Sequence, residues 1–159
     1  MTTLGILASD QKVVDRFNSH IHPDVLSMLP EVLARISLSG EQFKVVQVDF
    51  DHVVGNTTCV VTNTGDLIVY GQRPKRFGLT RFVKNRQPES CKSVVVILMK
   101  AQDEANTYVL ITAFIGTKPE PEPWDRNTTA ESIPFWNIHA MVWGSEPIIP
   151  GTETEVCPW

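Results

Sequence analysis

The chain has 159 residues, of which 42% are hydrophobic and 20% are charged, and this composition is that of a globular protein. Its formal net charge is −4, and its apolar runs are far shorter than the ~20 residues of a membrane-spanning helix. The first residues, MTTLGILASDQKVVDRF, lack the basic and apolar regions of a signal peptide. Three separated cysteines give no metal-ligand spacing, so we expect a cytoplasmic protein without metal, cofactor or membrane partner.

The first forty residues predict helices. A cap at Asp10 favours a helix that runs toward His20, with its apolar residues on one face. Pro23 suits the first turn of a second helix, which contains one internal proline and ends at Gly40. We therefore expect residues 1–40 to be an N-terminal helical segment.

Short runs rich in valine, isoleucine and threonine follow and predict strands. These runs cover residues 43–50, 57–62, 66–70, 79–83, 92–100 and 106–114. A glycine-containing turn between the second and third runs predicts a hairpin. Residues 130–142 return to a helical pattern broken at Pro134, and three prolines after position 146 predict an extended tail.

Helices followed by consecutive strands are the element order of an α+β fold. The predicted architecture has N-terminal helices, then a curved antiparallel β-sheet and a short C-terminal helix. The length predicts one domain. Within it we expect helices in residues 1–40, the sheet core in 41–145 and the extended tail in 146–159.

Basic residues gather in one segment of this acidic chain. Between positions 73 and 86 there are six basic residues and no acidic residue: Arg73, Lys75, Arg76, Arg81, Lys84 and Arg86. Tyr70, Phe77 and Phe82 alternate with them, and aromatic rings beside cations offer stacking surfaces for unpaired bases. The segment predicts either a polyanion-binding surface or a solvated basic hairpin.

Three other residues have the chemistry of a catalytic site. His52 follows a predicted strand and has Asp51 beside it to orient the imidazole. His139 lies among aromatic residues, where a histidine is either part of the core or a base in a dry pocket. Thr112 either bonds the backbone of its strand or faces a phosphate. No phosphate-binding glycine loop or catalytic-cysteine motif is present in the sequence.

From about residue 43 to 143 the chain resembles the small toxin-type ribonucleases of the barnase–EndoU–colicin–RelE superfamily. The resemblance is carried by the segments DHVVGNTTCVVT, RPKRFGLTRFVKNR, YVLITAF and FWNIHAMV. It implies helices before a curved antiparallel sheet across which RNA lies. The chain departs from many such nucleases in being acidic overall.

The resemblance also implies the site. The implied catalytic residues are His52, Arg76, Arg81, Thr112 and His139. The implied substrate-binding residues are Arg73, Lys75, Phe77, Lys84 and Arg86.

These residues predict a metal-independent RNA endonuclease in which the ribose 2′-OH attacks the adjacent phosphate. One imidazole removes the 2′-OH proton, and arginines stabilise the charge of the phosphorane. The expected partners are RNA, either tRNA or mRNA, and a cognate immunity or antitoxin protein. The alternative is a non-enzymatic binding or immunity-type module whose basic strip docks a polyanionic partner.

Overall fold

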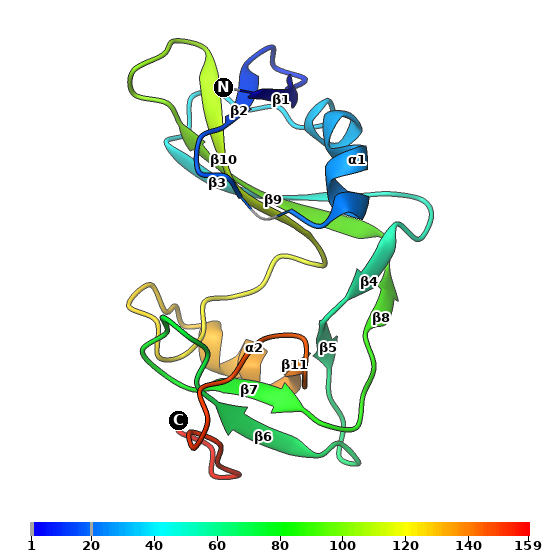
Figure 1. Cartoon of the computed structure of the whole chain (residues 1–159), viewed down its shortest axis with the longest axis vertical. Helices are drawn as coiled ribbons and strands as arrows, with labels where there is room; N and C mark the ends of the chain where they lie inside the picture. The colour runs from blue at the N-terminus through cyan, green and yellow to red at the C-terminus, as the bar shows by residue number, and fades with distance from the viewer. Residues whose placement is uncertain (1, 20) are drawn as a thin grey trace. The chain divides into compact units, whose positions relative to one another are not determined.

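The computed structural model of the chain describes residues 2–19 and 21–159 (Figure 1). The chain folds into two units, and each unit is built from separate stretches of sequence. Unit 1 contains residues 1–55 and 90–118, and unit 2 contains residues 56–89 and 119–159. In the described part of the chain, no helix is long and apolar enough to cross a membrane.

Unit 1 is built on a five-stranded sheet with the order β1-β2-β10-β9-β3. Neighbouring strands are antiparallel except for β2 and β10, which run parallel. The strand bounds are Thr2–Ile6 (β1), Lys12–Asp15 (β2), Phe43–Asp49 (β3), Ser93–Lys100 (β9) and Thr107–Ile115 (β10).

One helix, α1 (Pro23–Leu33), covers a face of this sheet (Figure 1). Val94, Val96 and Leu98 alternate along β9 and are fully buried in the core that α1 shares with the sheet. The helix starts with proline at its first position. The side chain of His22 caps this end by accepting a hydrogen bond from the Asp24 backbone N–H. The core of unit 1 therefore lies between α1 and the central strands.

Unit 2 is built on a four-stranded sheet with the order β5-β11-β7-β6. Strands β11 and β7 are parallel, while β5 and β6 are antiparallel to their neighbours. The short helix α2 (Ser132–Ile138) runs directly into β11. The strand bounds are Cys59–Val61 (β5), Ile68–Gly71 (β6), Thr80–Val83 (β7) and His139–Val142 (β11).

A third sheet pairs β4 (Gly55–Thr57) with β8 (Glu89–Cys91).

The chain passes between the units after residues 55, 89 and 118 and not at the predicted segment boundaries of 40 and 145. The extended tail is tied to unit 2 by a backbone bridge between Tyr70 and Thr154.

The predicted helix between Asp10 and His20 is wrong. Residues 12–15 form β2, in which Val13 packs in the core under α1 and Val14 packs on the other side against Ala101 and Val109. Successive side chains of a strand point to opposite faces, so β2 buries its two valines on the two sides of the sheet. Asp10 closes the preceding turn with a φ of 78°, and His20 lies outside the described residues.

The predicted α+β architecture, with N-terminal helices before one curved antiparallel sheet, is also wrong. Strands hold 35% of the chain in three sheets, helices hold 12%, and the first helix begins only at Pro23. The predicted hairpin of residues 57–62 and 66–70 does not form, because β5 pairs with β11 and β6 pairs with β7. In β11 buried Ala140 and Val142 alternate with less buried residues, which is a strand pattern that the helical prediction for 130–142 overlooked.

Candidate functional site at one end of the unit 2 sheet

Arg73 belongs to a mostly buried ion pair. Its Nη2 atom lies 2.6 Å from Oε2 of Glu122, and the two side chains are 15% and 10% exposed. Its Nε atom donates a hydrogen bond of 3.1 Å to Oγ1 of Thr80. The pair joins the loop before β7 to the proline-rich segment around residue 122, so Arg73 is a structural anchor of unit 2.

Two further cations of the basic segment also have partners within unit 2. Arg86 pairs with Asp66 at 3.0 Å and with Glu89 at 2.8 Å. Lys84 places its Nζ atom 5.0 Å from the centre of the Trp143 ring, a cation–π contact. The two carboxylates neutralise the charge of Arg86, whereas Lys84 stays exposed beside the Trp143 ring.

The loop between β6 and β7 is a tight and well-fixed turn. The N–H of Arg76 donates to the carbonyl of Arg73 at 3.2 Å, with Pro74 and Lys75 at the central positions. Lys75 has a φ of 61°, as the third position of a type II turn requires, and proline suits the second. Gln72 Nε2 donates to the carbonyl of Arg76 at 2.7 Å and closes the loop from inside.

The turn exposes a cationic and aromatic tip, defined here as residues 75–77. Lys75 and Arg76 are exposed and have no side-chain partner among the described residues, and Phe77 is 95% exposed. The next residue, Gly78, lies so close to Trp124 that a Cβ atom there would be 2.2 Å from the indole Cγ. The tip is therefore presented to solvent by a loop whose base is packed.

His139 is held in one orientation by Phe135, four residues earlier. The two rings are stacked at 3.8 Å and 2°, and Nδ1 of His139 lies 2.9 Å from the Phe135 carbonyl oxygen. A carbonyl only accepts, so Nδ1 carries the hydrogen, and in the neutral ring Nε2 carries the lone pair. No described residue donates to this Nε2 atom, which makes His139 a candidate base.

The topology places His139 and the tip at the same end of the unit 2 sheet. Strand β7 begins at Thr80, directly after the loop that carries the tip, and β11 begins at His139 and runs parallel beside it (Figure 1). Arg81 fixes this end, because its Nη1 donates at 2.9 Å both to Thr62 Oγ1 and to the His139 carbonyl. Arg81 is thus bonded within the site, to two neutral acceptors.

His52 and Thr112 lie in unit 1. His52 Nδ1 is 2.8 Å from Oδ1 of Asp51, and this hydrogen bond is the main reason that the pKa of Asp51 is lowered. Thr112 is half-buried on β10, beside a register shift of the β9–β10 ladder. The predicted catalytic set is therefore divided, with His52 and Thr112 in one unit and Arg76, Arg81 and His139 in the other.

Neither a metal site nor a reactive Cys59 thiol is found in residues 2–19 and 21–159. Within these ranges no group of three His, Cys, Asp or Glu side chains is placed to hold a metal ion. Burial, with a smaller contribution from the charge of Glu122, raises the pKa of the Cys59 thiol to about 11. This thiol is therefore protonated and poorly nucleophilic at neutral pH.

The sequence did not single out three residues of this site: Phe135, Thr62 and Glu122. Phe135 had a readable signal, since it precedes His139 by four residues in a predicted helix, and such residues share a face. Thr62 and Glu122 had none, because their partners come from strands and loops distant in the chain.

Comparison of the chain with family models, with curated protein sequences and with solved structures gives no match. The resemblance to the toxin-type ribonucleases therefore stays a prediction from the sequence. The functional assignment rests on the geometry of the site itself.

Proposed function

We propose that the end of the unit 2 sheet that carries the tip binds single-stranded RNA and cleaves it without a metal. The observation that carries this proposal is the position of His139 at the same sheet end as two free cations and an exposed phenylalanine. The RNA is an unpaired segment, such as a tRNA loop or a stretch of mRNA.

The tip has the chemistry that an unpaired nucleotide needs. The ring of Phe77 offers a face on which one base stacks, a contact worth about 1–3 kcal/mol. The guanidinium of Arg76 matches the oxygens of one phosphate, and Lys75 adds a second positive charge. The packed base of the loop fixes the backbone of these three residues, so little backbone entropy is lost when RNA binds.

In the proposed reaction, Nε2 of His139 accepts the proton of the ribose 2′-OH. The 2′ oxygen then bonds to the adjacent phosphorus, the bond from phosphorus to the 5′ oxygen breaks, and that oxygen takes a proton from water. The products are a 2′,3′-cyclic phosphate and a free 5′-hydroxyl. Stabilisation of the phosphorane charge falls to Arg76, and proton transfer by a positioned imidazole contributes about 10²–10⁴-fold.

The second candidate function is binding without cleavage. It is favoured by the division of the predicted catalytic residues between the units, which leaves His139 as the one histidine of unit 2 in the sequence. In this case the tip docks a polyanionic partner, and His139 only packs against Phe135.

The two candidates are separated by incubating the purified chain with a labelled single-stranded RNA in EDTA. Products that end in a 2′,3′-cyclic phosphate, identified by mass spectrometry, support cleavage. DNA of the same sequence serves as the matched control, since it lacks the 2′-OH and is expected to bind without being cut. RNA binding without products favours the second candidate, and a chain that neither binds nor cuts RNA contradicts both.

Replacing Phe77 with alanine is expected to weaken RNA binding by about 1–3 kcal/mol, or roughly 5–150-fold, through loss of base stacking. The measurement is a titration of labelled single-stranded RNA followed by fluorescence anisotropy. Phe43→Ala is the matched control, since this phenylalanine is also exposed, at 58%, but belongs to unit 1. Equal affinities for the two variants would show that the tip does not contact bases.

The salt dependence of RNA binding is expected to be shallow. With Lys75 and Arg76 as the free cations, the slope of log K against log salt should be about −1.4, at about 0.7 for each phosphate contact. If all six basic residues of the segment contacted phosphates, the slope would be about −4. Anisotropy titrations between about 50 and 200 mM salt distinguish these values. The steeper slope would mean that the ion pairs of Arg73 and Arg86 open on binding.

A further inference from the structure

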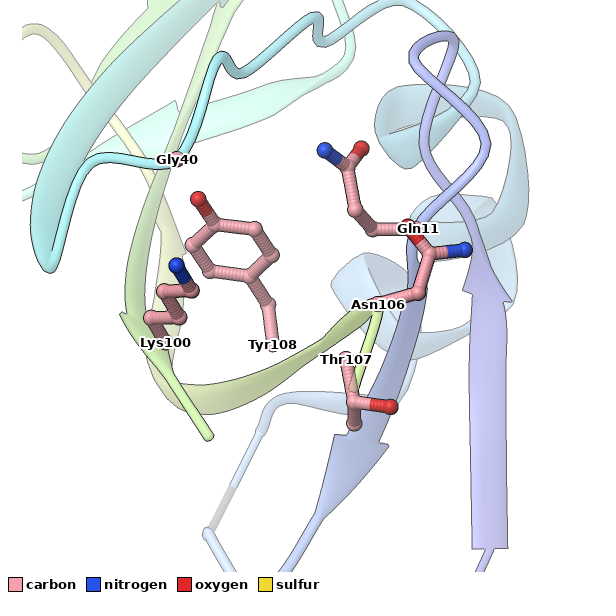
Figure 2. Close-up of a pocket in the computed structure, with 6 residues that line it drawn as sticks. All are labelled: Gln11, Gly40, Lys100, Asn106, Thr107 and Tyr108. Atoms are coloured by element: carbon pink, nitrogen blue, oxygen red, sulfur yellow. The ribbon is translucent and has the colours of Figure 1, made fainter. Parts of the chain in front are cut away.

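An open pocket of about 170 Å³ lies at one end of the unit 1 sheet (Figure 2). This volume slightly exceeds that of a cavity able to hold benzene, so it suits a ligand of about six to ten non-hydrogen atoms. All residues of the pocket belong to unit 1, and the RNA site proposed above belongs to unit 2. The lining residues are Gln11, Gly40, Lys100, Asn106, Thr107 and Tyr108.

Lys100 occupies a position in β9 that faces the core. Side chains two apart on a strand share a face, so Lys100 continues the buried series of Val94, Val96 and Leu98. It also pairs across the ladder with Tyr108, which is buried. Figure 2 shows the two side chains next to each other, and the Lys100 ammonium lies 4.0 Å from where a Cβ atom on Gly40 would be.

No carboxylate among the described residues neutralises this ammonium. The two acidic residues of the loop between β9 and β10 are already paired, Glu104 with Lys12 and Arg16, and Asp103 with Arg16. A further carboxylate, that of Glu41, accepts its hydrogen bonds from Ser39, so the Lys100 ammonium has no ion-pair partner among the described residues. Lys100 is half-buried and lines the open pocket, so its ammonium can reach both water and a bound group.

The other polar walls of the pocket are fixed by hydrogen bonds within unit 1. Gln11 Nε2 donates to a backbone carbonyl of the loop before β3 at 3.1 Å, and the Tyr108 hydroxyl donates to the Glu41 carbonyl at 2.9 Å. Asn106 Nδ2 donates to the Asp10 carbonyl at 3.3 Å. Lys100 is thus the donor that remains available in an otherwise preorganised pocket.

We propose that this pocket binds a small organic anion. Its carboxylate or phosphate group accepts hydrogen bonds from Lys100 Nζ, and the rest of the molecule lies between Tyr108 and Gln11. Charge-assisted hydrogen bonds of this kind are stronger than neutral ones, so the pocket selects for the charged group. This inference is independent of the proposed RNA cleavage.

The test compares three probes of similar shape: benzoate, phenyl phosphate and the neutral benzamide. Binding is followed by the backbone amide NMR shifts of the full chain. An anion is expected to shift Gly40 and Asn106 with a Kd of about 1 mM, which suits so few atoms. Benzamide should bind roughly tenfold more weakly, because its neutral carbonyl accepts from the ammonium without forming an ion pair. The stronger of the two anions identifies the preferred group as carboxylate or phosphate.

Lys100→Met keeps an unbranched stem and removes the charge, and it is expected to abolish the preference for the anions over benzamide. Lys44→Met is the matched control, since Lys44 is exposed on the neighbouring strand β3 and does not line the pocket. Benzamide that binds the wild-type chain as tightly as the anions overturns the proposal, and so does a preference that survives Lys100→Met. The proposal is also overturned if neither anion shifts the amide NMR signals at a concentration of about twenty times the expected Kd. The wild-type comparison stands even if the Lys100 variant fails to fold.

Discussion

Replacing His139 with asparagine is expected to reduce RNA cleavage by about 10²–10⁴-fold without weakening RNA binding. The asparagine Nδ2–H stands where the imidazole Nδ1–H stood and keeps the hydrogen bond to the Phe135 carbonyl. The variant loses the Nε2 lone pair that the proposed reaction requires, together with the ring that stacks on Phe135. Initial cleavage rates in EDTA and anisotropy titrations on the same RNA measure the two quantities.

His52→Asn is the control for this experiment. His52 also bonds its neighbour through Nδ1, in this case the Asp51 carboxylate, but it belongs to unit 1. We expect its replacement to leave cleavage within a few fold. If His52→Asn loses cleavage while His139→Asn keeps full activity, the catalytic base is His52. The sequence resemblance implies His52 as a catalytic residue, and this result would contradict a catalytic base in unit 2.

Replacing Glu122 with alanine is expected to lower the free energy of unfolding of unit 2 by about 3–5 kcal/mol. The change leaves the guanidinium of Arg73, whose side chain is only 15% exposed, without its carboxylate. Urea denaturation followed by tryptophan fluorescence measures this effect. The signal reports on unit 2 alone, since all four tryptophans follow residue 119 and lie in that unit.

Two further variants test the cause of this loss. The exposed Glu153 lies in the same unit, and Glu153→Ala is expected to change the free energy of unfolding by less than about 0.5 kcal/mol. The double variant Arg73→Met with Glu122→Leu should regain most of the stability, because it leaves no unpaired buried charge. A double variant as unstable as Glu122→Ala would show that the pair is not the source of the effect.

The elements that the sequence predicted correctly are those with a single local explanation. The run KSVVVILMK is apolar on both faces, which suits a central strand, and it forms β9. The adjacent pair Val13–Val14 fits either a helix or a strand. Its state is decided by β10, which lies more than ninety residues later and pairs with β2. Pairings of this range leave no mark on a short stretch of sequence, so the N-terminal helix was wrongly predicted.

The same limit applies to the site. The sequence shows that Arg73 is positively charged, but it does not show that Glu122, 49 residues later, pairs with it. Lys75, Arg76 and Phe77 are exposed, as the basic segment predicted, because the turn that presents them is local. Lys84 is exposed too, but it lies over the Trp143 ring. The position of Lys100 could not be predicted from alternation alone, because Val95 is as fully buried as Val94 and Val96.

The interleaved order of the two units has a consequence for synthesis on the ribosome. In unit 1, β10 lies between β2 and β9 and begins only at Thr107. In unit 2, β11 lies between β5 and β7 and begins only at His139. A nascent chain that has reached residue 100 therefore contains all the remaining strands of the two sheets but lacks the strand that joins β2 to β9 and the strand that joins β5 to β7. Neither unit completes its sheet until the ribosome has passed residue 115 for unit 1 and residue 142 for unit 2. The two units thus mature late and close together in time, and not one after the other as successive domains do.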